Sequence, residues 1–244
     1  MSRLLLLLLL ISCGNNQAGN IKNSIFDQFG ALIQSDTTEQ TIYLCFTGHD
    51  FNDGFDHVLE VLKENAIKGS FFLTGDFIRV NGEITKKIKQ EGHYIGAHSD
   101  KHLLYCDWNK RDSLLHTVDS IKMDISQNLE ELYKLNINPE TFMPPYEWYN
   151  LSVVNAAADL NQQVINFTPG TRSHADYTTP DLKHYISSRD ILESIYNFED
   201  RNGMNGFHLL IHPGVSPLRT DKFYLHLDDL IVKLREKGYS YARF

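Results

Sequence analysis

Short apolar runs rich in β-branched and aromatic residues alternate with amphipathic segments from residue 41 onward. Runs of this length, bounded by turn residues, predict buried strands. We expect seven strands, at residues 41–47, 69–75, 93–98, 141–145, 163–168, 207–212 and 239–244. The stretch before them, residues 29–44, predicts a hairpin that leads into the first strand.

The amphipathic segments between the strands predict helices. Behind Asp53, a residue type that can cap a helix, apolar residues recur at helical spacing at Phe55, Val58, Leu59 and Leu62. The longest helix is expected from about Asp112, with its apolar stripe on Leu115, Val118, Ile121, Ile125, Leu129 and Leu132. Two more helices are expected at residues 187–198, opened by a serine cap, and at 221–238, closed by Gly238.

This alternation of strand and helix requires parallel strand pairing with right-handed crossovers. Seven strands predict an α/β fold, a distorted and incomplete parallel (β/α)7 barrel, although an open doubly wound sheet has the same local signature. With 244 residues, 42% of them hydrophobic, the chain can bury one large core, and we expect a single domain over residues 25–244.

The first thirteen residues, MSRLLLLLLLISC, have the pattern of a targeting segment. Arg3 provides a positive start, and the apolar run of residues 4–11 is too short to span a bilayer. Its end resembles the lipobox of bacterial lipoproteins, which implies a signal peptide over 1–13 and a lipid on Cys13; a plain secretory signal is the alternative. Residues 14–24 predict a short tether. The expected location is the bacterial cell envelope, with membrane contact only through the lipid.

Charge and cysteine usage narrow the choice of partners. The formal net charge is −8, and lysine and arginine are scattered along the chain. Because binding to a phosphate backbone requires a basic stripe, nucleic acid is not an expected partner. Cys45 lies inside an apolar strand and predicts a buried thiol; a disulfide with Cys106 cannot be inferred from the sequence.

Polar residues follow the ends of several expected strands. The carboxyl ends of parallel strands meet at one edge of the fold, where their loops form a common mouth. These ends read Thr47-Gly48-His49-Asp50, Thr74-Gly75, His98-Ser99-Asp100-Lys101-His102, Pro144-Pro145-Tyr146 and His212-Pro213-Gly214. Three separate strands therefore bring histidine or aspartate to the same rim.

These segments resemble, in order, the motifs of the polysaccharide deacetylases of carbohydrate esterase family 4. "HSDKH" is similar to the family's H-S/T-x-x-H motif, "KGSFFLTG" to its K-A-T-F-F-V-T-G strand, "FMPPY" to its R-P-P-Y motif and "FHLLIH" to its last L-L-H motif. The resemblance covers about residues 41–215. It implies a distorted parallel barrel that carries a divalent metal.

The family's first motif, T-F-D-D-G, has no direct counterpart in "FTGHDFNDGF". Its first aspartate serves as general base and its second as metal ligand. Aligning residues 47–51 with this motif makes Asp50 the ligand and puts His49 at the base position, and we prefer this alignment. Aligning residues 50–54 makes Asp53 the ligand instead, and Asp53 could equally be a helix cap. Met143 stands where the family has an arginine that would hold the base.

The resemblance implies a metal site formed by Asp50, His98 and His102, with zinc the cation expected. Three protein ligands leave an open position, as a catalytic site requires, and a metal-activated water can attack an acyl carbonyl. His212 is the candidate acid that protonates the leaving group, and His49 is either a base or a further ligand. At Pro145 and Tyr146 we expect substrate contact, with Tyr146 as donor to the oxyanion.

The predicted function is hydrolytic removal of N- or O-acetyl groups from a polysaccharide or peptidoglycan-type glycan. The altered first motif supports a second hypothesis, a catalytically impaired lipoprotein that keeps the fold and binds glycan. A glycosidase would need paired carboxylates at the strand ends, where this sequence has histidines, and is therefore the least favoured hypothesis.

Trp108 and Trp148 follow rim motifs and could stack on a sugar ring. His174 and Asp176 follow the fifth strand and could tune His212 or touch substrate.

Overall fold

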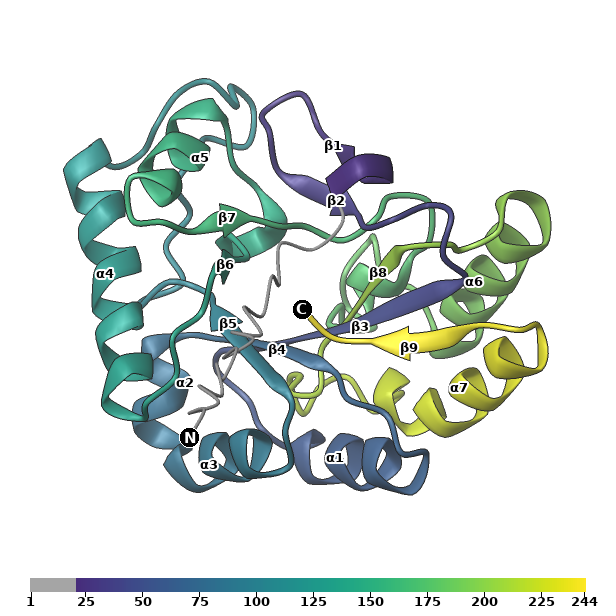
Figure 1. The fold of residues 1–244 in the computed structure, drawn as a ribbon. Helices are drawn as coiled ribbons and strands as arrows, with labels where there is room; N and C mark the ends of the chain where they lie inside the picture. The colour runs from purple at the N-terminus through teal and green to yellow at the C-terminus, as the bar shows by residue number, and fades with distance from the viewer. Residues whose placement is uncertain (1–20) are drawn as a thin grey trace, which may run out of the picture.

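The computed structural model describes residues 21–244 (Figure 1). The predicted signal peptide, its Cys13 and residues 14–20 of the predicted tether lie outside this range. The last part of the predicted tether belongs to the folded domain, because Ile21–Asn23 forms a 3-10 turn, η1, and the Asn23 carbonyl accepts hydrogen bonds from the amide and hydroxyl of Thr37. No helix within residues 21–244 is both long enough and apolar enough to cross a membrane.

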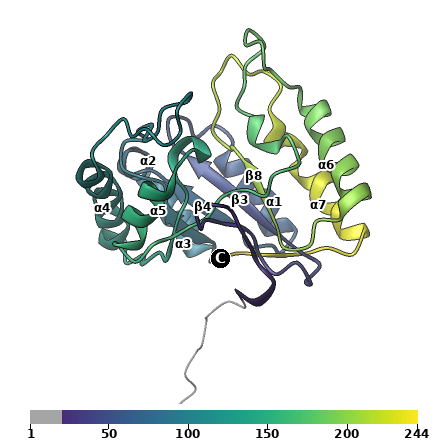
Figure 2. The same cartoon turned by 90° about the horizontal axis from the view of Figure 1, so that it is seen from above.

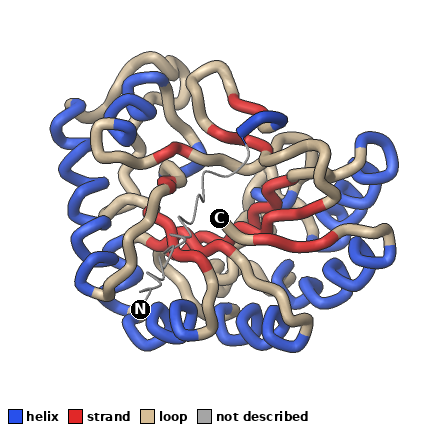
Figure 3. Tube along the Cα trace, viewed as in Figure 1, coloured by secondary structure: helices blue, strands red, loops and turns tan. Residues whose placement is uncertain are grey.

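Seven parallel strands form a curved sheet, as the sequence predicted. They are β3 (Thr41–Gly48), β4 (Ser70–Leu73), β5 (Tyr94–Ala97), β6 (Thr141–Phe142), β7 (Gln163–Val164), β8 (Phe207–Ile211) and β9 (Ser240–Ala242). Their order is β8-β3-β4-β5-β6-β7, and β9 pairs with the first half of β3. The strands curl into the middle of the molecule and helices cover the outside (Figure 3), which confirms the distorted barrel.

The hairpin before the barrel attaches in an unexpected place. Strands β1 (Ile25–Phe26) and β2 (Leu32–Gln34) pair antiparallel, and β2 continues antiparallel onto β8, not onto β3. Beyond β7 the Ile165 amide still donates to Phe142 of β6, but the Asn166 amide donates to the carbonyl of Leu32 and the Thr168 amide to that of His208. The expected strand at 163–168 therefore splits its hydrogen bonds between three partners, which draws the two sides of the barrel together.

Within residues 21–244, seven α-helices cover the sheet. They are α1 (Phe55–Glu64), α2 (Gly75–Val80), α3 (Gly82–Gln90), α4 (Val118–Lys134), α5 (Leu151–Ala158), α6 (Ser188–Asn202) and α7 (Leu227–Glu236), with 3-10 turns η2 (Pro145–Glu147), η3 (Ser173–Ala175) and η4 (Phe223–His226). The serine cap of α6 is confirmed at Ser187. The longest helix begins at Val118 and not near Asp112, because the Thr117 hydroxyl accepts from the Ser120 amide and caps it there.

Apolar side chains fill both sides of the sheet. The larger cluster lies between the sheet and the helices, where Phe46 and Phe71 stack at 4.8 Å between ring centroids. A smaller cluster fills the barrel interior and consists of Cys45, Phe72, Met143, Ile165 and Leu210, with the C-terminal Phe244 packed against it. Seen from above (Figure 2), the helices stand on both flanks of this sheet. Cys45 and Cys106 are buried and free.

Candidate functional site

His98 lies directly after β5 and is 1% exposed. Its ring Nδ1 is 2.7 Å from the carbonyl oxygen of Met143. Because a carbonyl only accepts, Nδ1 carries the proton, and Nε2 has the free lone pair that a metal ligand needs. Burial lowers the pKa of His98 to about 3, and the charges of His49 and His212 act in the same direction. The ring is therefore neutral at ordinary pH.

His102 reaches the same place through a tight turn, not a helical one. Ser99 and His102 both have positive φ, of 70° and 54°, and the Ser99 hydroxyl accepts from the His102 amide at 3.0 Å. The turn sets the two histidine rings 4.9 Å apart at an angle of 63°. Burial also lowers the pKa of His102, with His98 as the next cause. The sequence motif thus brings two neutral imidazoles together.

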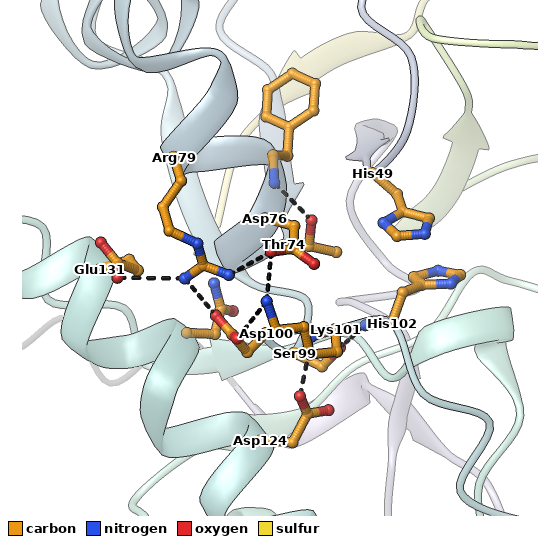
Figure 4. Close-up of polar contacts among 12 residues, drawn as sticks. His49, Thr74, Asp76, Arg79, Ser99, Asp100, Lys101, His102, Asp124 and Glu131 are labelled. Atoms are coloured by element: carbon orange, nitrogen blue, oxygen red, sulfur yellow. Dashed lines mark hydrogen bonds and ion pairs between the residues drawn. The ribbon is translucent and has the colours of Figure 1, made fainter.

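His49, at the end of β3, joins this pair. Its ring stacks on His102 with centroids 4.2 Å apart and planes 15° apart, and Figure 4 shows the two rings facing each other. The Nε2 atom lies 3.1 Å from Asp50 Oδ1, and the Asp50 side chain is 66% exposed. Within the described residues, His49 Nδ1 is buried and has no hydrogen-bond partner.

These donors fit a divalent cation in part. His98 offers a lone pair at Nε2, and the orphaned Nδ1 of His49 is the kind of buried atom that a ligand would satisfy. In this conformation, however, no three His, Cys, Asp or Glu side chains within 21–244 are gathered closely enough to hold an ion. Since ring lone pairs lie in the ring plane, the parallel rings of His49 and His102 do not aim at one point. The predicted set of Asp50, His98 and His102 is not assembled here.

An ion-pair network holds the turn that carries the histidines (Figure 4). Arg79 on α2 contacts the buried Asp100 at 2.7 Å, Asp76 at 2.6 Å and Glu131 at 3.2 Å. Gly75 makes this contact possible, because a Cβ there would lie 1.8 Å from Asp100 Oδ1. The turn is therefore locked against α2 from behind.

Helix α4 supplies further support through buried polar side chains. Asn128 Oδ1 accepts from the His98 amide at 2.8 Å, and its Nδ2 donates to the Leu73 carbonyl at 3.0 Å. Asp124 accepts from the Lys101 amide and from the hydroxyl of Tyr105. Sequence reasoning missed these two residues, although polar residues four apart within the apolar stripe of α4 were the available signal.

His212 follows β8 and is held by Asp176. The Asp176 carboxylate accepts from the His212 amide at 2.8 Å and contacts ring Nδ1 at 2.5 Å. Burial lowers the pKa of His212, but the charge and hydrogen bond of Asp176 outweigh it, so the pKa is raised. Of the two residues suggested to act on His212, Asp176 is in direct contact with it. His49, His98 and His212 directly follow the parallel strands β3, β5 and β8, and His102 stacks on His49, so the four imidazoles share one edge of the barrel.

The loop after β6 carries Tyr146 and an acid that the sequence analysis did not single out, Glu147. Pro145 is buried, and the Tyr146 ring lies 4.5 Å from the His102 ring. Tyr146 and Glu147 both have positive φ, of 59° and 53°, which is rare for residues with side chains. Burial raises the pKa of Glu147 to about 7, while the charges of His212 and Asp176 act in opposite directions. Glu147 had no motif that marked it.

Asp53 has a different role from either that was expected. The cap position of α1 is Gly54, and no side-chain cap bond forms there. The Asp53 carboxylate instead accepts from the Val215 amide at 3.0 Å and the Tyr224 hydroxyl at 2.8 Å, and Lys222 lies 2.9 Å away. Through these contacts Asp53 ties the loop after β3 to the loop after β8, and its carboxylate does not cap α1.

The end of β3 shows which residues face which side. Cys45 belongs to the interior cluster and Phe46 to the outer core, so Thr47 faces the interior again. The Thr47 hydroxyl is buried without a partner among the described residues. At Gly48 a Cβ would lie 2.7 Å from Leu73 and 2.9 Å from Phe55, so the outer position has no room for a side chain.

A cavity of about 630 Å³ adjoins the histidines. We call it the aromatic cavity, because its walls include Phe29, Trp108, Tyr146, Trp148, Phe167 and Tyr177. Trp108 is 54% exposed, and its ring lies 5.6 Å from both Tyr146 and Trp148. The two tryptophans singled out in the sequence therefore lie side by side in one wall.

Comparison with known proteins agrees with this fold. The polysaccharide deacetylase family model matches residues 34–165, more than half of the chain. The peptidoglycan-N-acetylmuramic acid deacetylase PdaA of Bacillus subtilis is 27% identical over 226 residues, which cover 92% of this chain and 77% of that protein. A peptidoglycan-N-acetylglucosamine deacetylase of Bacillus cereus is 25% identical, covering 79% and 83%. The chain belongs to the polysaccharide deacetylase family.

Solved structures show the same fold. The structure of Bacillus subtilis PdaA, a family 4 carbohydrate esterase, superposes with a TM-score of 0.68 at 25% identity, over 88% of this chain and 83% of that one. A family 4 pseudoenzyme from Bacillus anthracis superposes with a TM-score of 0.69 at 22% identity, over 88% and 67%. The second likeness is one of fold alone.

Proposed function

We propose that this protein is a metal-dependent hydrolase that removes N- or O-acetyl groups from a glycan of the bacterial cell envelope. The observation that carries the proposal is the placement of the Asp176–His212 pair, after β8, at the same edge of the sheet as His98 and His102, after β5. A proton donor for the leaving group beside two neutral imidazoles that can bind a metal is an arrangement suited to hydrolysis of an acyl group. Peptidoglycan is the favoured glycan, because the relatives named above are peptidoglycan deacetylases.

His98 and His102 are the residues proposed to hold the metal. A divalent cation bound to them would polarise the acyl carbonyl and lower the pKa of a water molecule. Asp50 is better placed to orient His49 than to act as a ligand, because it lies 3.1 Å from His49 Nε2. With Nε2 directed at a carboxylate, His49 Nδ1 can take the proton of the attacking water, and Asp50 stabilises the resulting imidazolium.

His212 acts on the leaving group. Asp176 holds the proton on Nδ1 and raises the pKa, so the ring is cationic over a wider pH range and can donate from Nε2. As the bond between the acyl carbon and the sugar nitrogen or oxygen breaks, this proton goes to the departing atom and acetate is released. The backbone amide or hydroxyl of Tyr146, beside His102, is proposed to donate to the oxyanion, and the buried Pro145 positions it.

A second candidate function has its own support. The side-chain directions in β3 favour aligning Cys45-Phe46-Thr47-Gly48 with the family's T-F-D-D, because Phe46 fills the outer core and Gly48 has no room for a side chain. In that alignment both acidic positions are lost, to Thr47 and Gly48. This favours a protein that binds glycan without hydrolysing it, and family members without activity are known among the similar structures.

Acetate release separates the two candidates. The zinc-loaded protein is incubated with acetylated peptidoglycan fragments and with acetylated chitin oligomers, and acetate is quantified with and without a chelator. The hydrolase proposal predicts release that disappears with chelator, returns with zinc, and falls by on the order of 10²-fold or more in His212→Ala. Tight glycan binding without any acetate release would favour the binding protein.

The proposal for the location rests on the sequence alone. We propose that Cys13 carries the lipid that holds the protein at the envelope, on the lipobox-like end of residues 1–13. Labelling with a lipid precursor tests this, since Cys13→Ala should abolish the label and release the protein from the membrane fraction.

A further inference from the structure

The aromatic cavity continues the candidate site. Two of its wall residues touch the histidines: the Tyr146 ring lies 4.5 Å from His102, and the Tyr177 ring lies 5.3 Å from His212. A sugar whose acetyl group reaches the histidines therefore extends its neighbouring residues along these rings. Aromatic faces of this kind stack well on the apolar faces of sugar rings.

Arg111 places a fixed positive charge in the wall of this cavity. Its guanidinium carbon lies 4.1 Å from the centre of the Trp148 ring and 4.6 Å from that of Phe29. Its Nε donates to the Tyr149 carbonyl at 2.5 Å. Among residues 21–244 no carboxylate lies within ion-pair distance of Arg111. One edge of the guanidinium is used for anchoring, and its other N–H groups have no protein partner in the described part of the chain.

The other charged or titratable groups of the cavity do not neutralise Arg111. Asp27 accepts from the amides of Phe29 and Ala31 and from the Tyr149 hydroxyl, so its oxygens are already engaged. His174 is stacked on Phe167 with ring centroids 4.5 Å apart, and burial lowers its pKa, so it is neutral near pH 7. Burial favours the uncharged form of Glu147.

A guanidinium is well suited to recognise a carboxylate. Its planar N–H groups match the two carboxylate oxygens, and it gives up its hydration more readily than an ammonium does. Three aromatic rings pack against the guanidinium of the half-buried Arg111, with centroids 4.1 to 5.2 Å from its central carbon, and hold it in place. An uncharged sugar hydroxyl would bind the Arg111 guanidinium more weakly than an anion would.

We propose that Arg111 binds a carboxylate of the glycan, so that the protein selects acidic acetylated polysaccharides over neutral ones. The inference rests on the proposed function in one respect, that the occupant of the site is a glycan. Two sources carry the required chemistry: the lactyl ether of muramic acid, and the ring carboxylate of a uronic acid. In both, the carboxylate lies within one or two sugar residues of an acetyl group.

Binding by calorimetry tests the inference without turnover. The protein is used in a His212→Ala background, with an N-acetylglucosamine–N-acetylmuramic acid disaccharide and an acetylated glucuronic acid oligosaccharide as probes. Each probe is compared with its counterpart in which the carboxyl group is reduced to an alcohol. Arg111→Gln removes the charge, and Arg189→Gln on α6, whose side chain is 86% exposed, is the matched control.

We expect reduction of the carboxyl group to weaken binding of at least one probe by about 10-fold or more, as for a charge-assisted bidentate contact. Arg111→Gln should abolish that difference and Arg189→Gln should keep it. The acidic probe that shows the difference identifies the source of the carboxylate. The comparison of each acidic probe with its reduced counterpart is made on protein that keeps Arg111. It therefore remains a test even if the Arg111→Gln variant fails to fold.

Three results would overturn the inference: equal binding of acidic and reduced probes, equal weakening of both by Arg111→Gln, or no binding of either acidic probe. The deacetylase proposal fails separately, if the unmutated protein releases no acetate from any glycan. Acetate release from neutral chitin oligomers as fast as from the acidic probes would leave the deacetylase standing and contradict the selectivity.

Discussion

His212 and Asp176 are joined twice, through the backbone amide of His212 to Oδ2 at 2.8 Å and through ring Nδ1 to Oδ1 at 2.5 Å. The double contact fixes both the ring orientation and the position of its proton. Asp176 is itself 1% exposed, so little solvent screens its charge. This contact widens the pH range in which His212, the proposed acid, is protonated.

Asp176→Asn should narrow that range. His212 donates only while protonated, so activity falls as pH rises through its pKa. Because Asp176 raises this pKa, its neutral replacement lowers it, and the alkaline limb of the kcat profile moves to lower pH. The exposed Asp181→Asn is the control and should leave the limb in place. An unchanged limb in Asp176→Asn would show that another group protonates the leaving atom.

Glu147→Gln should change how stability depends on pH. The carboxyl has a pKa of about 7 in the folded protein against 4.5 for an unperturbed glutamate, so between these values the folded state binds a proton that the unfolded chain has released. Stability therefore falls as pH rises through this window. Relative to Glu147→Gln, the unmutated protein should lose about 2 kcal/mol of unfolding free energy between pH 5 and 8.

Urea unfolding at the two pH values measures this difference. The exposed Glu140→Gln serves as the control, and its stability should follow that of the unmutated protein at both pH values. If the unfolding free energy of Glu147→Gln changes with pH as that of the unmutated protein does, the Glu147 carboxyl is solvated and its pKa is not raised.

Asn128→Leu should loosen the turn that carries both histidines. The substitution leaves the His98 amide and the Leu73 carbonyl buried without their partner. Each unsatisfied group costs about 1–3 kcal/mol, so we expect a loss of about 2–4 kcal/mol in the unfolding free energy, together with weaker zinc binding. Asn155→Leu on the exposed side of α5 should change neither. A variant that loses zinc affinity with no loss of stability would contradict this structural role.

The barrel could be predicted because strand runs and helical stripes are local signals. The ends of the elements were less predictable, since they depend on contacts between distant segments. The expected strand at 141–145 stops at Phe142, because Pro144 and Pro145 have no amide to donate. Residues 166–168 leave the partner strand β6 because the carbonyls of Leu32 and His208 accept the amides of Asn166 and Thr168.

The site was predictable where one motif carries the geometry. His98 and His102 lie together as expected, and His212 joins their edge. Asp53 could not be assigned, because its partners Tyr224 and Lys222 lie about 170 residues away in the chain. Arg111 and Glu147 could not be predicted as site residues, because the cavity that they line forms only where several loops converge and no local spacing marks it.

Trp108→Ala should weaken substrate binding more than chemistry. The ring is half exposed beside Tyr146 and Trp148 and makes no contact with the histidines in the described structure. Loss of one stacking surface should raise KM about 5- to 10-fold with kcat nearly unchanged. Tyr133→Ala, an equally exposed aromatic on α4, is the matched control. A fall in kcat at constant KM would place Trp108 in the chemistry instead.

The proposed hydrolytic mechanism depends most on a single metal ion that His98 and His102 bind together. Anomalous diffraction at the zinc edge, from crystals grown with zinc, locates that ion directly. We predict one strong peak about 2.0–2.1 Å from His98 Nε2 and from a ring nitrogen of His102. A peak held by other residues, or none at these two histidines, would contradict the hydrolytic mechanism.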